Sequence, residues 1–291
     1  MTRQTATFVG FVAIFLWSLL ALLTVASTPV PPLQLTSMAF AIGGGLGLIW
    51  AAAKSGFSQL RNTGWKVYAF GTAGLFGYHL LYFSALRLAP PAEAGLIAYL
   101  WPLLIVLFSG LLPGEHVRRG HVIGAAISFA GAALIVTKGG GGFSAAALPG
   151  YGLAFLCALV WAGYSVLSRR LGHVPTSAVA VFCVATAALS LPLHLMFEQT
   201  VWPTNMRTWL AITGLGLGPV GLAFYVWDIG VKQGDIQLLG VASYAAPLLS
   251  TLILGIAGMT TLTSGLIVAA ILITLGALIA ARSSLRARKE V

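Results

Sequence analysis

One histidine and two aromatic residues share a face of an apolar segment, where they could bind a small molecule. His79, Tyr82 and Phe83 have the spacing i, i+3 and i+4, so on a helix they project from one side. His79 lies eight residues before Arg87, about 12 Å along a helix, which places its imidazole near the middle of a membrane. An imidazole at that depth can hydrogen-bond a ligand or carry a proton. A neutral histidine that is satisfied by a carbonyl or a tyrosine hydroxyl is the alternative.

A matching face recurs 145 residues later in the chain. This shift carries the first face onto Phe224, Trp227 and Asp228. Asp228 stands four residues before Lys232 near an expected helix end, so an i, i+4 ion pair is the simpler account of its carboxylate. An exporter of cationic drugs would need an acidic residue deep in the membrane, and Asp228 is the one candidate for that role.

Two tyrosines also correspond under this shift, and each precedes a proline. Tyr99 stands three residues before Pro102, and Tyr244 three residues before Pro247. A proline inside a membrane helix removes a backbone donor and bends the helix. We therefore predict that Pro102 and Pro247 act as hinges.

Symmetry between the two parts of the chain should gather their aromatic side chains around one axis. The result would be a cavity with aromatic walls and a few hydrogen-bonding tips, suited to a planar or apolar side chain and to an ammonium group. The alternative is that these rings pack against one another or anchor at the membrane interface. We predict a substrate-binding set of Trp17, Tyr78, His79, Tyr82, Tyr99, Trp101, Trp161, Tyr164, Phe224, Trp227, Asp228 and Tyr244.

The composition indicates that a membrane surrounds these residues. Of the 291 residues, 58% are hydrophobic and only 8% are charged, whereas soluble domains carry about 25% charged residues. A membrane helix needs roughly 20 apolar residues. We predict spans at 5–26, 33–53, 65–88, 91–112, 118–137, 148–170, 176–197, 207–231, 236–258 and 262–281.

The positive charges predict the orientation of these spans. With the N-terminus inside, the inner segments carry 13 Lys and Arg residues and the outer segments carry 3. Cytoplasmic loops are enriched in such residues, so both termini should face the cytoplasm. The net charge of +10 is then explained by basic loops near anionic lipid, and we expect no nucleic-acid partner.

The chain repeats itself internally. Residues 95–132 align without gaps on 240–277, with 11 identities in 38 positions, whereas the biased composition alone would give roughly four. We therefore predict a first five-helix repeat at 1–137, a Gly-rich linker at 138–147, a second repeat at 148–281 and a basic tail at 282–291. Five helices per repeat force the halves into opposite orientations, an arrangement typical of secondary transporters.

Several short motifs carry a family resemblance. They are Trp17-Ser18, the segment Tyr82–Arg87, the YLWP of Tyr99–Pro102, Gly114-Glu115, Gly120 through Gly131, Trp161, the YAAP of Tyr244–Pro247 and Gly265 through Gly276. With them the chain resembles the drug/metabolite transporter superfamily in its ten-helix form with two EamA-type halves. Thr260 departs from the pattern, because the family often has an acidic residue there.

Within that superfamily, the aromatic interior is most similar to the YddG-type amino acid exporters of bacterial inner membranes. The resemblance implies an all-α membrane protein of two inverted five-helix repeats around a central cavity, which exports aromatic and other neutral amino acids by alternating access. A proton-coupled exporter of drugs or other small metabolites is the alternative. We expect no catalytic activity, metal or cofactor, because no catalytic triad, metal cluster or phosphate-binding loop is present. We expect a monomer in the lipid bilayer.

Overall fold

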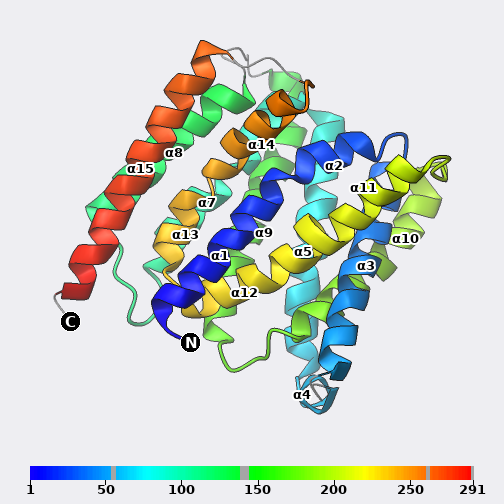
Figure 1. Cartoon of the computed structure of the whole chain (residues 1–291), viewed down its shortest axis with the longest axis horizontal. Helices are drawn as coiled ribbons and strands as arrows, with labels where there is room; N and C mark the ends of the chain where they lie inside the picture. Colours follow the sequence, from blue (N-terminus) through cyan, green and yellow to red (C-terminus); the bar gives the residue numbers. More distant parts are fainter. Residues whose placement is uncertain (54–56, 138–143, 260–262, 290–291) are drawn as a thin grey trace.

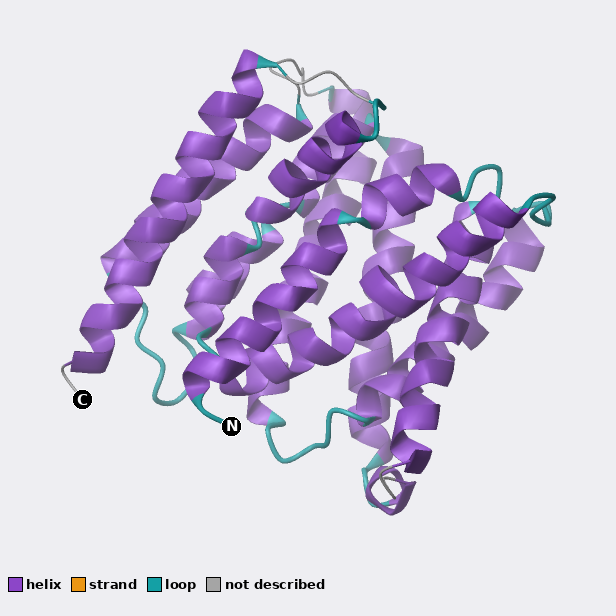
Figure 2. Cartoon of the chain, in the orientation of Figure 1, coloured by secondary structure: helices purple, strands orange, loops and turns teal. Residues whose placement is uncertain are grey.

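The computed structural model describes residues 1–53, 57–137, 144–259 and 263–289, and these residues form helices and loops without a strand (Figures 1 and 2). In chain order the elements are α1 (Arg3–Ser18), α2 (Leu20–Ala26), α3 (Pro32–Ala53), α4 (Phe57–Arg61), α5 (Trp65–Leu88), α6 (Pro91–Ala98), α7 (Trp101–Ser109), α8 (Arg119–Val136), η1 (Ala145–Ala147), α9 (Leu148–Arg170), α10 (Ala178–Phe197), α11 (Met206–Leu217), η2 (Gly218–Leu222), α12 (Ala223–Gln233), α13 (Ile236–Ala242), α14 (Ala245–Ile256) and α15 (Ser264–Lys289).

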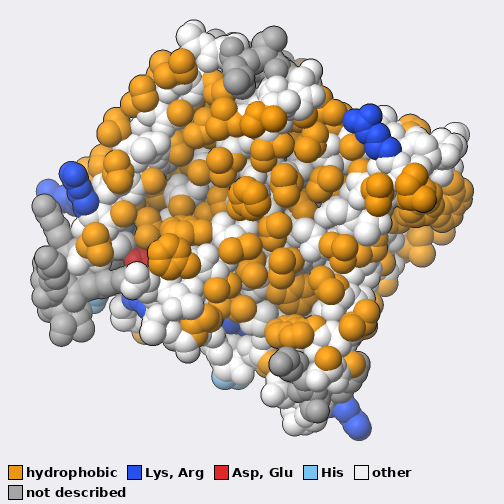
Figure 3. All heavy atoms as spheres, viewed as in Figure 1, with side chains coloured by type: hydrophobic (Ala, Val, Ile, Leu, Met, Phe, Trp, Pro, Cys, Tyr) orange, Lys and Arg blue, Asp and Glu red, His pale blue; other side chains and the backbone are white. Residues whose placement is uncertain are grey.

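Nine helical stretches in the described part of the chain are long and apolar enough to cross a membrane. A further helix, α5, has 24 residues but is not among these nine stretches, because glycines, tyrosines and His79 interrupt its hydrophobic sequence. The outer surface matches a lipid environment: Phe8 is 61% exposed and Ile256 86%. Figure 3 shows hydrophobic side chains across the broad face of the molecule, with Lys and Arg mostly toward its margins.

Helices from the first part of the chain pack against helices from the second part throughout the bundle. The main pairs are α8 with α15, α3 with α10, α5 with α9 and α1 with α12. Each pair joins a helix before residue 138 to one after residue 143, and both chain ends lie at the same end of the bundle (Figure 1). The first and second parts of the chain therefore share one interior and do not form separate domains.

Two of these pairs cross at glycines. On α15, a Cβ at Gly276 would meet the carbonyl oxygen of Gly124 on α8, and Gly10 of α1 lies against Gly230 of α12. Small residues let membrane helices approach closely, so that van der Waals contact can hold them together.

Several predicted spans are interrupted near the middle of the bundle. The span predicted at 91–112 forms α6 and α7 with a break at Tyr99 and Leu100, and the span at 236–258 forms α13 and α14 with a break before Ala245. Each proline lies just after the break, in the first turn of the second helix, which is where a missing backbone N–H is tolerated. α1 also ends at Ser18, and η2 is a π-helical turn that contains Pro219.

Candidate functional site

A cavity of about 150 Å³ lies among the broken helices. Its walls come from α1, α2, α5, α6, α7, α9, η2, α12 and α14 and the residues that link them. The lining residues are Trp17, Leu20, Tyr78, His79, Tyr82, Ala98, Tyr99, Trp101, Trp161, Pro219, Val220, Phe224 and Ala246. None of the residues named in this lining is Asp, Glu, Lys or Arg, so the wall is aromatic and formally neutral.

The structure brings most of the predicted binding residues to this cavity. The members of the predicted set that line it are Trp17, Tyr78, His79, Tyr82, Tyr99, Trp101, Trp161 and Phe224. Tyr164, Trp227, Asp228 and Tyr244 do not line it. These four residues lie in the packing around the cavity.

Four indole rings form a cluster at one side of the cavity. The centroid of Trp17 is 6.1 Å from that of Trp101, 5.9 Å from that of Trp161 and 5.0 Å from that of Trp227. Trp101 and Trp227 are also edge to face at 5.9 Å. Because these tryptophans come from α1, α7, α9 and α12, the cluster ties together helices from both parts of the chain.

His79 has one ring nitrogen engaged. Its Nδ1 lies 2.8 Å from the carbonyl oxygen of Leu75. A carbonyl can only accept, so Nδ1 carries the proton and, in the neutral ring, Nε2 is an acceptor. The ring stands edge to face with Phe40 at 4.9 Å and with Phe224 at 6.3 Å. A carbonyl partner of this kind is what the alternative interpretation of His79 expected, but it engages only one ring nitrogen. The other nitrogen is left for a ligand.

The aromatic side chains differ in how their polar tips are used. The Trp17 Nε1–H donates to the carbonyl of Pro219 at 3.1 Å, and the Trp227 Nε1–H donates to the Ser165 hydroxyl at 3.1 Å. The Tyr244 hydroxyl accepts from the backbone N–H of Leu103 at 3.1 Å. These three tips serve the fold.

Five other polar tips, on residues that line the cavity, make no hydrogen bond within the described residues. They are the hydroxyls of Tyr78, Tyr82 and Tyr99 and the indole N–H groups of Trp101 and Trp161. Tyr78 and Tyr82 lie nearly parallel, with ring centroids 6.1 Å apart. A ligand in the cavity would therefore meet neutral donors, the free nitrogen of His79 and aromatic faces.

Asp228 forms the ion pair that its spacing indicated. Its carboxylate lies 2.9 Å from the Lys232 ammonium and accepts from the Thr176 hydroxyl at 2.7 Å. Both charged side chains are buried, with 2% and 5% of the surface exposed. A buried cation needs a partner, and this pairing engages Asp228 away from the cavity.

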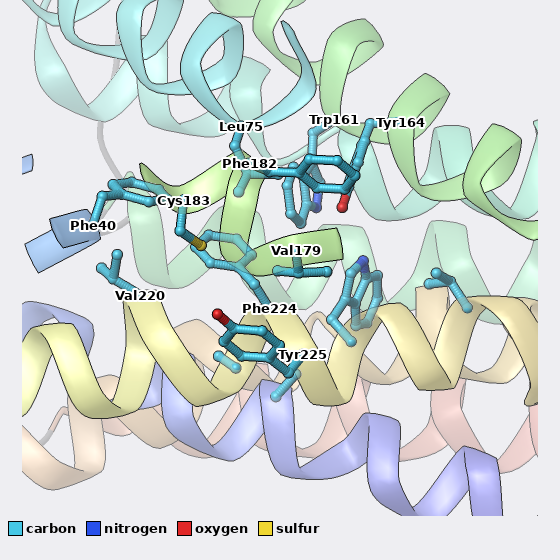
Figure 4. Close-up of a cluster of buried hydrophobic side chains, with 14 of the residues drawn as sticks. Phe40, Leu75, Trp161, Tyr164, Val179, Phe182, Cys183, Val220, Phe224 and Tyr225 are labelled. Carbon is cyan, nitrogen blue, oxygen red and sulfur yellow. The ribbon is translucent and has the colours of Figure 1, made fainter. Parts of the chain in front are cut away.

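Tyr164 and Tyr244 are engaged in packing beside the cavity. Tyr164 packs against Phe70 with ring centroids 5.6 Å apart and planes tilted by 30°, and it neighbours Trp161 one turn away on α9, as Figure 4 shows for the pair Trp161 and Tyr164. Tyr244 meets Phe129 of α8 at 5.9 Å. The symmetry argument matched Tyr244 with Tyr99, but Tyr244 does not line the cavity. Its hydroxyl instead accepts from the backbone N–H of Leu103 at the start of α7.

Some lining residues carried no signal of chemistry in the sequence. Leu20, Ala98, Val220 and Ala246 are ordinary apolar residues. Pro219 is different, because it follows Gly218 inside an apolar span, and such a pair indicates an irregular turn. This π turn brings its carbonyl to Trp17.

Between the indole cluster and the end of the molecule where α1 begins, packed side chains close the interior. Ala13, Ile105, Val231 and Leu239 have no exposed surface there. The lining residues Leu20, Tyr82 and Ala98 lie further from that end along their helices. The cavity therefore sits on the opposite side of the indole cluster from Arg3.

Comparisons with known proteins agree with this architecture. A model of the EamA-like transporter family matches residues 4–137 and 148–282. The chain is 54% identical over 283 residues to the aromatic amino acid exporter YddG of Ancylobacter novellus, covering 96% of this chain and 98% of that protein. It is 26% identical over 294 residues to the aromatic amino acid exporter YddG of Salmonella typhimurium, covering 96% and 97%. A solved crystal structure with 54% identity superposes with a TM-score of 0.94, covering 98% of this chain and 99% of the other.

Proposed function

Because the chain belongs to the EamA-like transporter family, we propose that it exports aromatic and other neutral amino acids across a bacterial inner membrane. The observation that carries this proposal is the cavity, whose walls are aromatic and whose named lining residues are uncharged. The 54% identity to an aromatic amino acid exporter supports the same substrate class. The chain is a multi-pass membrane protein. Its similar proteins are transporters and exporters, which supports a transport activity for this chain.

The membrane arrangement we propose has ten crossings in two inverted five-helix repeats, at 1–137 and 148–281, joined by a linker at 138–147. Helix α5 would be the tenth crossing. The two family matches, the pairing of early with late helices and the common end of the two termini support this arrangement. The excess of Lys and Arg in alternate loops supports cytoplasmic termini, with residues 282–291 as a basic tail.

The proposed binding residues are the predicted ones that line the cavity. Aromatic faces would hold the substrate side chain and contact its ammonium group. The free hydroxyl and indole tips would donate hydrogen bonds to its carboxylate, and Nε2 of His79 would accept one from the ammonium. Neutral partners of this kind suit a zwitterion, which carries no net charge.

Transport would follow alternating access around this fixed site. Repeats that rock against each other expose a central site first to one side and then to the other. Pro102 and Pro247, beside the helix breaks, would be the hinges of that motion. Trp17, Trp101 and Trp161 contact one another across the two repeats, so their packing would change as the repeats move.

Substitution of the cavity residues tests this proposal. His79→Ala and Tyr99→Ala should each exchange radiolabelled phenylalanine in proteoliposomes at least about tenfold more slowly than the wild type, because each loses a ligand contact worth about 1.4 kcal/mol. Phe8→Ala is the control, since Phe8 is 61% exposed on the outer surface. Exchange at the wild-type rate by well-folded His79 and Tyr99 variants would contradict the proposal.

The alternative, a proton-coupled exporter of drugs, is disfavoured by the position of Asp228. Its carboxylate is paired with Lys232 and does not line the cavity. The double variant Asp228→Asn, Lys232→Met removes both buried charges together and so leaves no unpaired ion. We expect cells that carry it to keep any drug resistance that the wild type confers, and a loss of resistance at equal protein levels would favour the alternative.

A further inference from the structure

The Glu115 side chain connects its own loop to three helices at the end of the molecule where α1 begins. It lies in the loop after α7 and is 9% exposed. Its Oε2 accepts from Arg3 at 3.0 Å and from the Gln237 side chain at 3.1 Å, while Oε1 pairs with Arg169. The partners belong to α1, α13 and α9, so one carboxylate joins the first and second parts of the chain.

Arg169 extends this network to α12. Its Nη1 donates to the carbonyl oxygens of Val231 at 2.8 Å and Gly234 at 2.9 Å, at the C-terminal end of that helix. These carbonyls have no partner within their own helix, and a cation is favoured at a helix C-terminus. The guanidinium thus holds α12 and the loop of Glu115 at the same time.

The network lies far from the binding cavity and across the closed part of the interior. Arg3 and Trp17 are 14 residues apart, about 21 Å along the axis of a helix. Between them lie Ala13, Ile105 and Leu239, all without exposed surface. Glu115 therefore cannot touch a substrate in the cavity, but its contacts span the helices that close this end.

The repeat does not reproduce these residues at the other end. The shift of 145 carries Glu115 to Thr260 and Gln237 to Ala92. The match of Trp17 with Trp161, a shift of 144, carries Arg3 to Ala147 and Arg169 to Val25. None of these counterparts is charged, so the network of Glu115 has no symmetry-related copy at the other end, where a different buried carboxylate, that of Glu198, pairs with Arg87 and His194.

We propose that Glu115 is a positioning residue for transport, whose ion pairs hold this end closed and so set the side to which the binding cavity opens. The proposal rests on the proposed function, because it assumes alternating access between the two ends. A repeat with the same hydrogen-bonding residues at both ends would favour neither state. Loss of the carboxylate charge leaves the partly buried Arg169 guanidinium, 17% exposed, without a counter-ion, which destabilises the closed end relative to the open one.

Thiol labelling of the protein in lipid nanodiscs tests this inference without any substrate. In a background where Cys157 and Cys183 are replaced by Ala, one cysteine is placed in the closed region by Leu239→Cys, and separately one in the cavity by Ala98→Cys. Glu115→Gln should raise the rate at which a water-soluble maleimide labels position 239 by at least about tenfold. The same substitution should not raise the rate at position 98, because the reagent reaches the central cavity of a nanodisc-embedded protein from whichever side is open.

The matched control is Glu198→Gln at the opposite end. Glu198 is also buried, with 4% of its side chain exposed, and accepts hydrogen bonds from His194 at 2.9 Å and Arg87 at 3.4 Å. This variant should not increase labelling at position 239. A general loosening of the fold by Glu115→Gln would raise labelling at both cysteines, and that result would overturn the proposal, as would unchanged labelling or an equal rise in the Glu198→Gln variant.

If the Leu239→Cys protein does not give a monodisperse peak in gel filtration, Val106→Cys replaces it, since Val106 is buried in the same region. Phenylalanine exchange is measured in parallel on the wild type. If the variants label as expected but the wild type transports no phenylalanine, the proposed substrate is rejected and the role of Glu115 stays supported, so the two failures are distinguishable.

Discussion

At the scale of the residue, the cavity is defined by which polar tips the fold has already used. The polar tips of Trp17 and Trp227 donate to the Pro219 carbonyl and the Ser165 hydroxyl, and the Tyr244 hydroxyl accepts from the N–H of Leu103. Tyr82 and Tyr99 keep theirs free beside the cavity. Binding specificity should therefore depend on the free hydroxyls of Tyr82 and Tyr99. Loss of a hydrogen-bonded tip, as in Trp17, Trp227 or Tyr244, should mainly lower the stability of the protein.

Removal of one free hydroxyl tests this division. Tyr82→Phe and Tyr99→Phe should each raise the KM for phenylalanine about fivefold, since a neutral hydrogen bond contributes about 1 kcal/mol. Tyr225→Phe is the matched change away from the cavity, because that hydroxyl donates to the Gly43 carbonyl at 2.9 Å. We expect it to lower the melting temperature and leave the KM within about twofold. A larger KM effect from Tyr225 than from Tyr82 and Tyr99 would contradict the division.

Helical spacing and the internal repeat together predicted part of this site. The i and i+3 positions of His79 and Tyr82 identified a cavity face, although Phe83 at i+4 does not line the cavity, and Tyr99 followed from its position before Pro102. The same symmetry brought Tyr244 and Trp227 into the predicted set, although neither lines the cavity. Sequence shows equivalent positions but not which orphan donor a side chain satisfies, and the N–H of Leu103 in the first turn of α7 is such a donor.

At the scale of the element, the bundle depends on close crossings of paired helices. The α8–α15 pair is the clearest case, because a Cβ at Gly276 would meet the backbone and the Ser128 side chain of α8. Boundaries of the long helices were predictable from hydrophobic length. The end of α1 at Ser18 was not, because no proline stands near it. The Gly218-Pro219 pair indicates an irregular turn, but the sequence does not show that the turn is π-helical.

Addition of one methyl group at this crossing should separate the two helices. We expect Gly276→Ala to destabilise the protein by about 1–3 kcal/mol, the usual cost of overpacking, measured as the melting temperature in detergent. Gly45→Ala serves as the control, since nothing lies within 4 Å of the added carbon. Equal melting temperatures for the two variants would show that the α8–α15 contact is looser than its geometry indicates.

At the scale of the whole molecule, helices far apart in sequence build one interior. α1 packs on α12 and α3 on α10, so neither half has a complete core. The internal repeat predicted two five-helix parts around a central cavity, but it did not predict which helices of one part pack on which helices of the other. The ion pairs of Glu115 were not predictable, because they depend on the meeting of α1, α9 and α13 with the loop after α7.

Orientation is testable with reporters fused to the C-terminus. The distribution of Lys and Arg predicts that this end is cytoplasmic. A fluorescent reporter that matures only in the cytoplasm should be bright at this position, and an alkaline phosphatase that is active only in the periplasm should be inactive. An active phosphatase and a dark fluorescent fusion would show that the chain is inserted the other way.

The most direct test of the central claim is counterflow by the wild-type protein. Liposomes that contain the purified protein are loaded with unlabelled phenylalanine and diluted into a trace of radiolabelled phenylalanine. We predict rapid, saturable accumulation of label, which tryptophan and tyrosine suppress and which lysine and glutamate leave unchanged, because no charged residue is found among those named in the cavity lining. Accumulation no greater than in protein-free liposomes, or stronger competition by lysine than by tryptophan, would contradict the assignment as an exporter of aromatic and other neutral amino acids.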